Sequence, residues 1–328
     1  MTMDMKVCPS TLQEGFETYS PKARRTLLGG KRASHILPYE SLSSGPGLTE
    51  NQGHLSLSGA QKKYGAVIDH GVFRLTTPDE QGTYILKPKL SDFESRDFSP
   101  ANEHLTMQIA SQVFGIRTAD SGLCFAQNGD QVYITRRFDV LEDGTKLQQE
   151  DLASLAGISR DTHGGNYKYD ALGYVDLAEI IKKYIPAWRV ELVKYYDLVL
   201  FNTAFCNGDA HVKNFSVLQT TQGDYMLSPA YDLINTQLHI PGDPVFALKK
   251  GLYPGWNPEF GVSGTDFLKF GKAIGLEDSV AKTELDRFCA DYEEIDRLVH
   301  HSFLSDPLKE EYLELYHARL RYCLRSGL

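Results

Sequence analysis

The spacing of hydrophobic residues divides the chain into a first part rich in predicted strands and a second part rich in predicted helices. Glycine and proline separate short β-branched and aromatic runs, which predict strands at residues 64–69, 71–77 and 83–89. Residues 122–138 predict a hairpin that turns at Asn128-Gly129. Residues 21–28 predict a short helix, and apolar positions at helical spacing predict a longer one over residues 100–114.

After Phe138 the pattern becomes helical. It predicts four helices, the last two amphipathic, over residues 177–184, 188–205, 279–300 and 307–324. The end of the second is apolar on all sides, which is typical of a buried helix. A short strand pair is expected around residues 215–219 and 225–229. The order predicts an α+β protein with a β-rich part, residues 1–137, and a helical part, residues 138–328, and ligand sites often lie at such junctions.

Composition narrows the choice of partners and compartment. The chain has 328 residues and a net charge of -9, which disfavours wrapping of DNA or RNA, so no direct nucleic-acid binding is expected. A signal peptide and a membrane-spanning run are both absent from the sequence, which predicts a cytoplasmic protein with no membrane partner. The five cysteines are scattered and favour reduced thiols over a metal or disulfide role.

The most informative segment is residues 207–214, Asn-Gly-Asp-Ala-His-Val-Lys-Asn, which follows the predicted buried helix. Asp209 and Asn214 are five residues apart, and Asp232 lies eighteen residues further on. Phosphoryl transfer from ATP needs a carboxylate to accept the proton of the attacking hydroxyl and hard oxygen ligands for Mg²⁺. The alternative is that Asp209 and Asn214 only form a turn. The accompanying His211 and Asp232 favour the kinase interpretation.

Two weaker signals lie in the first part. Lys87 ends a predicted strand and could reach ATP phosphates, with Glu103 of the next helix holding it in place. By itself, a lysine at a strand end is more often a solvated surface residue. Residues 53–62 contain glycines that would let backbone N–H groups approach a phosphate, although a plain flexible loop is an equal alternative.

Taken together, these residues resemble the HipA family of bacterial toxin kinases. The resemblance rests on motifs in the family's order, namely Ser-Leu-Ser-Gly-Ala-Gln-Lys, Ile-Leu-Lys, Asn-Glu, Arg-Arg-Phe-Asp, Gln-Glu-Asp-Leu, Gly-Asp-Ala-His-Val-Lys-Asn-Phe-Ser and Tyr-Asp-Leu. They extend from about residue 53 to residue 233. The resemblance implies a two-lobed protein-kinase-like fold with an ATP cleft between a β-rich lobe and a helical lobe.

The resemblance also assigns roles to individual residues. Asp209 would be the catalytic base, and Asn214 and Asp232 would hold Mg²⁺. The implied contacts to ATP come from the Gly-rich loop, the strand lysine and its glutamate, the linker between the lobes and the catalytic loop: Gly59, Ala60, Gln61, Lys87, Glu103, Arg136, Phe138 and His211. Residues 136–138 of the linker would be the hinge that offers backbone groups to adenine. Family members autophosphorylate a serine in the Gly-rich loop, which here would be Ser56 or Ser58.

The chain departs from the long members of the family in two ways. Only about fifty residues precede the Gly-rich loop, so the sequence is closer to the short HipT-like toxins of three-component systems. Long members have a glutamate in the linker between the lobes at the position where this chain has Arg136. The contacts to the adenine of ATP are therefore expected to differ from those of long members. The resemblance implies an aminoacyl-tRNA synthetase as substrate. It also implies a small antitoxin resembling the missing N-terminal subdomain and a helix-turn-helix antitoxin.

Two other functions are compatible with parts of the pattern. A small-molecule phosphotransferase of the aminoglycoside-kinase type would share Asp209, Asn214 and Asp232. Such an enzyme usually presents an acidic pocket for cationic substrates, whereas the segment after Asp232 in this chain contains Lys249 and Lys250. A non-catalytic binding module on a kinase fold is the third possibility, because fold alone does not establish activity.

Overall fold

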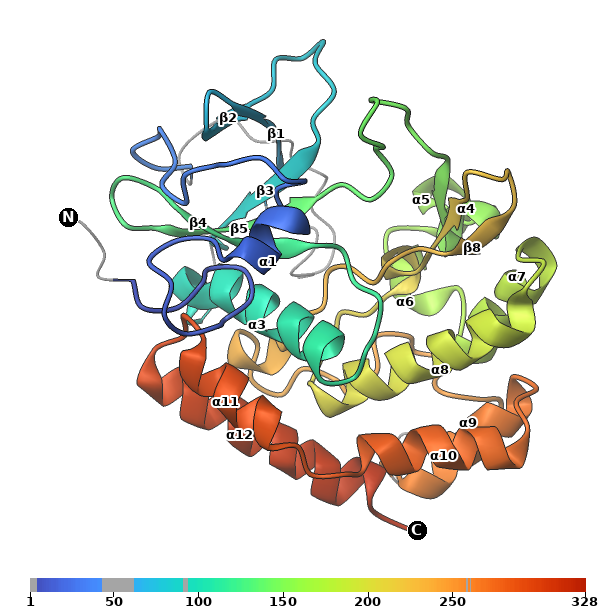
Figure 1. Cartoon of the computed structure of the whole chain (residues 1–328). Coiled ribbons are helices and arrows are strands. Elements are labelled where there is room, and N and C mark those ends of the chain that lie inside the picture. Colours follow the sequence, from blue (N-terminus) through green and yellow to red (C-terminus); the bar gives the residue numbers. More distant parts are fainter. Residues whose placement is uncertain (1–4, 43–61, 91–93, 258, 260) are drawn as a thin grey trace.

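A five-stranded antiparallel sheet forms the first part of the molecule (Figure 1). The structure is a computed structural model, and it describes residues 5–42, 62–90, 94–257, 259 and 261–328. The strands lie in the order β2-β1-β3-β5-β4, with bounds β1 Tyr64–Asp69, β2 Val72–Leu75, β3 Tyr84–Pro88, β4 Ser121–Phe125 and β5 Gln131–Arg136. The predicted strands and hairpin are thus confirmed. Gly71 and Gly129 have φ angles of 78° and 90°, which the tight turns beside them require.

The two faces of this sheet pack against different segments. Helix α3, Ser99–Gln112, covers one face, and Tyr133 of β5 points into that core. The neighbouring Val132 and Ile134 point the other way, into a second core. This alternation is the two-residue period of a strand, so residues next to each other in the chain belong to different hydrophobic cores.

The second core is closed by residues 5–42, which we call the N-terminal cover. It contains α1, Pro21–Arg25, which Ser20 caps through a 3.2 Å bond from the N–H of Ala23. The cover also pairs with the edge strand β4: Phe125 N–H donates to His35 O, and Leu37 N–H donates to Phe125 O, both at 2.8 Å. Covering an edge strand removes unpaired backbone groups that would otherwise attract another chain.

The second part of the molecule is mainly helical, as predicted, and also holds a three-stranded sheet (Figure 1). The sheet has the order β6-β7-β8, with bounds β6 Gln149–Asp151, β7 Ser216–Gln219 and β8 Tyr225–Leu227. The helices are α4 Leu152–Leu155, α5 Arg160–His163, α6 Tyr167–Asp170, α7 Tyr174–Tyr184, α8 Trp188–Ala204, α9 Gly264–Ala273, α10 Asp278–Phe288, α11 Glu293–His301 and α12 Asp306–Arg319. Single 3₁₀ turns lie at Arg96–Phe98, Val212–Asn214 and Thr236–Leu238, and a π-helical turn at Leu320–Leu324 follows α12.

The tail differs from the prediction of two helices, because α10 and α11 are separate. Helix α10 ends before Cys289, and the side chain of Tyr292 folds back to donate a 2.9 Å bond to the carbonyl of Arg287. The ring of Tyr292 also packs edge-on against Phe114, with centroids 5.3 Å apart. The continuous amphipathic pattern therefore concealed a break that a tertiary contact stabilises.

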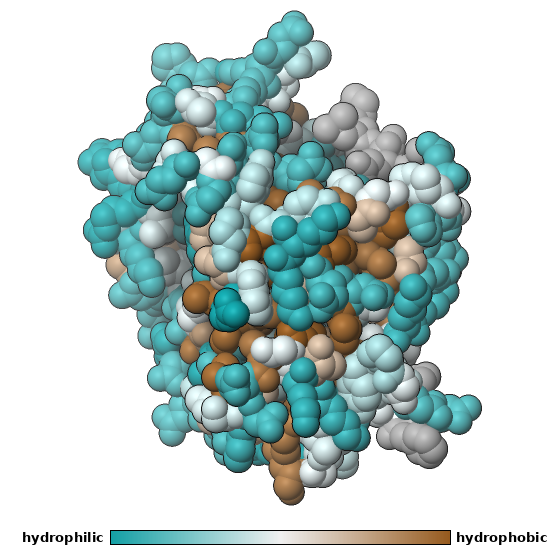
Figure 2. Space-filling view, turned by 90° about the vertical axis from the view of Figure 1, so that its right-hand side faces the viewer, coloured by the Kyte–Doolittle hydropathy of each residue, from teal (hydrophilic) through white to brown (hydrophobic). Residues whose placement is uncertain are grey.

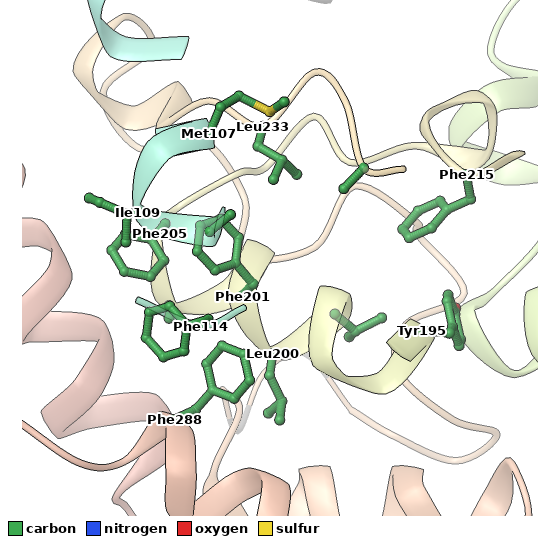
Figure 3. Packing of buried hydrophobic residues seen from close by; sticks show 14 of the residues in the cluster. Met107, Ile109, Phe114, Tyr195, Leu200, Phe201, Phe205, Phe215, Leu233 and Phe288 are labelled. Atoms are coloured by element: carbon green, nitrogen blue, oxygen red, sulfur yellow. The ribbon is translucent and has the colours of Figure 1, made fainter. Parts of the chain in front are cut away.

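Aromatic side chains fill the main core, where α3, α8 and α10 meet (Figure 3). Phe114 stacks on Phe288 with ring centroids 4.5 Å apart and an angle of 7° between the planes. Phe201 and Phe205 of the α8 end pack edge-on against Phe114, each at 5.8 Å. The prediction that the end of α8 is buried is confirmed, because Leu200, Phe201 and Phe205 have no exposed surface.

The surface is mostly hydrophilic. Figure 2 shows hydrophilic residues around the rim of one face and hydrophobic residues gathered toward its middle. Within the described residues, only four large hydrophobic side chains are classed as exposed, namely Ile36, Val190, Tyr322 and Leu328. No helix in the described part of the chain combines the length and apolar character needed to cross a membrane.

Candidate active site

Three charged side chains from separate segments meet at one buried point between the sheet and the helical part. Lys87 lies on β3 and faces α3, and its Nζ is 2.5 Å from Oε1 of Glu103. The same Nζ donates to a carboxylate oxygen of Asp232, which follows β8. Lys87 is 4% exposed and Glu103 is 2% exposed. Charges this deeply buried persist because they are paired with one another.

These charges fix one another's protonation states. Burial alone would lower the pKa of Lys87, but the negative charges of Asp232 and Glu103 raise it above its usual value. Burial would raise the pKa of Asp232, yet the positive charges of Lys63 and Lys87 hold it well below its usual range. Nζ of Lys63 lies 3.6 Å from Oδ2 of Asp232. At neutral pH, Lys87 is therefore a cation and Asp232 an anion.

Asp232 has a left-handed backbone, with a φ of 55°, which is uncommon outside glycine. Its neighbours hold this conformation. Tyr231 donates a 2.9 Å hydrogen bond to the carbonyl of Lys213, and its ring stacks on Phe138 with centroids 6.0 Å apart. The amide of Asn207 donates to the carbonyl of Asp232 at 3.4 Å. The strained residue is thus tied to the catalytic loop predicted from the sequence, and strain of this kind is concentrated at functional sites.

That loop, residues 207–214, begins immediately after the buried end of α8. The N–H of Asp209 is 3.3 Å from Oδ1 of Asn207. The phenol of Tyr169, in α6, donates a 2.6 Å hydrogen bond to Oδ1 of Asp209. Gly208 leaves no room for a side chain, because a Cβ there would overlap Asp243 and lie 2.5 Å from a Pro244 oxygen. The structure therefore brings Asp209 together with Tyr169, a residue that sequence reasoning did not select.

Two buried side chains of the loop have polar atoms without partners in the part of the chain that the structure describes. These atoms are both ring nitrogens of His211 and the amide oxygen of Asn214. Burial lowers the pKa of His211, so its ring is neutral at neutral pH. Unpartnered buried polar groups are costly, and they are expected where a ligand supplies the missing bonds.

The donor set fits a nucleotide with a hard divalent cation. Asn214 and Asp232 offer oxygen atoms, the ligand type that Mg²⁺ prefers, and Lys87 offers a positive charge for phosphate. Among the described residues there is no group of three His, Cys, Asp or Glu side chains suited to a metal ion.

Helix α3 is anchored to the segment that follows Asp232 by a pair of hydrogen bonds. The side-chain amide of Asn102 donates to the carbonyl of Asn235 at 2.7 Å, and Asn235 N–H donates to Oδ1 of Asn102 at 3.1 Å. Because Glu103 is the next residue of the helix, this anchor holds it near Asp232 and Lys87. Sequence reasoning singled out the Asn-Glu pair but not its partner, 133 residues away.

The side chain of Arg136 lies away from this point. Its side chain lies on the other face of the sheet, where it donates a 3.1 Å bond to the carbonyl of Thr26 and packs against Gly29. Its backbone N–H donates to the carbonyl of Asp120. Phe138, two residues later, does contact Tyr231 beside Asp232. The side chain of Arg136 is therefore engaged away from the Lys87 side of the sheet, and the expected backbone contacts of residues 136–138 to adenine stay a prediction.

The expected phosphate loop, residues 53–62, lies almost wholly outside the described residues. Ser56, Ser58, Gly59, Ala60 and Gln61 lie outside the described residues. Lys62 and Lys63 follow directly and belong to the described part of the chain, where Lys63 contacts Asp232.

Comparisons with known proteins identify the family of this chain. The family model of the HipA-like C-terminal domain matches residues 55–295. This chain belongs to that family. The part that matches the HipA-like domain includes every residue just placed around Lys87 and Asp209, whereas the N-terminal cover lies outside it.

Relatives of this HipA-like chain carry kinase names. A Haemophilus influenzae protein named "Putative kinase" is 26% identical over 330 residues, covering 95% of this chain and 94% of the relative. "Putative kinase Y4mE" of Sinorhizobium fredii is 30% identical over 220 residues, covering 65% of this chain and 50% of the relative. The chain thus spans nearly all of one relative and half of the other.

A solved structure shares the fold. It is a chain of the Shewanella oneidensis toxin–antitoxin complex of HipA, HipB and operator DNA. The TM-score is 0.67 at 18% identity, with 84% of this chain and 66% of the other covered. The mixed α and β fold with its antiparallel sheet is therefore a HipA-like fold.

Proposed function

We propose that this chain is an ATP-dependent Ser/Thr protein kinase whose nucleotide binds between a β-rich lobe and a helical lobe. The observation that carries the proposal is the contact of Lys87 with both Glu103 and Asp232, close to a loop that holds Asp209 and Asn214. A lysine, a helix glutamate, a base and two metal ligands are the parts that kinase chemistry requires. The kinase names of the relatives support the same activity.

Each residue has a role in this proposal. Lys87 would bind the phosphates, with Glu103 orienting it, and Asn214 and Asp232 would hold Mg²⁺. Asp209 would accept the proton that the acceptor hydroxyl loses as its oxygen bonds to phosphorus and ADP departs. His211, neutral and without a partner, could donate one hydrogen bond to a phosphate oxygen. When bound, Mg²⁺·ATP supplies the phosphoryl group and neutralises its charge.

The finer part of the proposal concerns regulation and partners. Autophosphorylation at Ser56 or Ser58 would add close to two negative charges to the loop that covers the nucleotide, which would lower ATP occupancy. We further propose that the chain is a HipT-like toxin that phosphorylates an aminoacyl-tRNA synthetase. Its antitoxins would be a small protein resembling the N-terminal subdomain of the long HipA proteins and a helix-turn-helix protein. The complex of HipA with HipB in the Shewanella structure supports the existence of an antitoxin.

The test is incubation with Mg²⁺·ATP followed by intact-mass measurement of the wild-type chain, Asp209→Asn and Asp232→Ala. We expect phosphorylation of the wild type and a fall in transfer rate by a factor on the order of 10² to 10⁴ in Asp209→Asn, the usual contribution of a general base. Asp232→Ala should lose the magnesium dependence of ATP binding. Asp79→Asn, at an exposed aspartate of a turn, is the matched control and should behave as wild type.

Three results would contradict the proposal. Wild-type turnover in Asp209→Asn would exclude Asp209 as the base. Transfer to an aminoglycoside without any self-phosphorylation or transfer to protein would favour a small-molecule phosphotransferase instead. If the wild type neither binds nor consumes ATP, a non-catalytic module becomes the better interpretation.

A further inference from the structure

The hydroxyl group of Tyr169 lies directly on the carboxylate assigned as the catalytic base. The distance from Tyr169 Oη to Asp209 Oδ1 is 2.6 Å, within the range of charge-assisted O–H···O⁻ hydrogen bonds. The ring of Tyr169 also packs edge-on against His211, with centroids 5.4 Å apart. Tyr169 therefore contacts two residues of the catalytic loop at once.

A hydroxyl at this distance from a general base has the geometry that an acceptor substrate must adopt. A base removes a proton only from a group within about 2.6 to 3.2 Å of it. Since Tyr169 donates to Oδ1 of Asp209, an acceptor hydroxyl that approaches Oδ1 along the same direction can bond it only after Tyr169 moves. The Tyr169 hydroxyl thus occupies the position that an acceptor hydroxyl would take beside Oδ1 of Asp209.

The segment that carries Tyr169 has little fully buried surface. Helices α5 and α6 contain no fully buried side chain. The carbonyl of Tyr169 accepts a 2.9 Å bond from Lys249 N–H, and Nζ of Lys249 lies 2.8 Å from Asp170. Both members of this ion pair are at least 45% exposed, and exposed pairs contribute little to stability. A segment with so little buried surface is among the first to open locally.

We propose that Tyr169 is an acceptor gate: its phenol occupies the acceptor position on Asp209 until a protein acceptor displaces it. The gate rests on the proposed function, because it requires Asp209 to be the base. While it is closed, the phenol takes the place that a water molecule would need beside Oδ1 of Asp209. Wasteful hydrolysis, in which a water oxygen bonds to the γ-phosphorus, its proton passes to Asp209 and ADP leaves, is thereby suppressed.

The experiment measures phosphate release from Mg²⁺·ATP by the full chain with no acceptor added. Tyr169→Phe keeps the ring against His211 and removes only the hydroxyl. Its turnover number should rise about tenfold, the effect of losing one hydrogen bond to a charged group, with KM for ATP unchanged. Tyr167→Phe, in the same helix, is the matched control and should leave the rate at the wild-type value.

The combination Tyr169→Phe with Asp209→Asn should abolish the gain, which shows that the extra hydrolysis depends on the base. A rate in Tyr169→Phe equal to or below wild type, in a protein whose turnover depends on Asp209, would overturn the gate and leave the kinase assignment standing. Turnover that ignores Asp209→Asn, or no turnover in any variant, would overturn both. A purely structural tyrosine would lower the rate or raise KM for ATP, and neither change resembles the expected result.

Discussion

At the scale of single residues, Gly208 is a position in the loop of residues 207–214 that leaves no space for a side chain. The loop passes so close to the segment after Asn235 that the N–H of Gly208 donates a 3.0 Å bond to the hydroxyl of Thr236. Thr236 in turn bonds Asp243, the residue that a Cβ on Gly208 would strike. The place of Asp209 therefore depends on the absence of a side chain at its neighbour.

Gly208→Ala should displace Asp209 and lower the rate of phosphoryl transfer by at least tenfold. Overpacking of this kind also costs about 1 to 3 kcal/mol of stability. Phosphate release and denaturant unfolding measure the two effects. Gly165→Ala is the control, because nothing lies within 4 Å of a Cβ there and its φ is not in the left-handed region. Equal activity in both variants would show that the loop has more room than the structure indicates.

At the scale of elements, Phe114 joins the end of α3 to the helical part. It follows the helix that carries Glu103, and its ring contacts aromatic residues of α8 and α10 (Figure 3). Only 5% of its surface is exposed. Aromatic stacks of this size contribute both buried area and ring-to-ring attraction.

Phe114→Ala should lower the free energy of unfolding by about 3 to 5 kcal/mol, the range for a buried phenylalanine that leaves a cavity. Denaturant titration followed by circular dichroism measures the change. The control is Val190→Ala, at a side chain that is 60% exposed, which should cost less than about 0.5 kcal/mol. A loss below about 1 kcal/mol in Phe114→Ala would mean that the α3 junction repacks freely.

At the scale of the whole molecule, the N-terminal cover and α3 are joined by a buried histidine. Nε2 of His104 lies 2.8 Å from the carbonyl of Ser10, so this nitrogen carries the proton. Nδ1 is buried and has no partner among the described residues. Burial lowers the pKa of His104 to about 4 from its ordinary 6.5. The imidazole is therefore neutral in the folded chain at any pH near neutrality.

This histidine makes stability fall in mild acid. Between pH 6.5 and about pH 4 the unfolded chain binds a proton at His104 that the folded chain does not. The free energy of unfolding therefore decreases as the pH falls through this window. The loss from pH 7 to pH 5 should be about 2 kcal/mol. His104→Gln, which can still donate to Ser10, should remove that part of the pH dependence. His300→Gln, on the surface, should leave it unchanged, and an identical pH profile in all three proteins would contradict the assignment.

The sequence by itself determined the local elements and the loop that carries the proposed chemistry. Strand alternation, turn glycines and the apolar end of α8 depend on residues within a few positions of one another, so their pattern is readable along the chain. The spacing of Asp209 and Asn214 is local for the same reason. Lys87 and Glu103 are sixteen residues apart, and their meeting could be predicted because a strand followed by a helix that packs on it is a short, common unit.

Only the tertiary structure decided which distant side chains meet. Tyr169 and Asp209 are forty residues apart, and Lys87 and Asp232 are 145 apart. No periodicity encodes such pairs, because they depend on how whole elements pack. The same reason explains why β6 was not predicted, since this polar run of three residues becomes a strand only by pairing with β7. It also explains the position of the Arg136 side chain, because the register of β5 against β3 determines which face of the sheet it lies on. Local pattern fixes the elements, and burial between elements selects the contacts at the site.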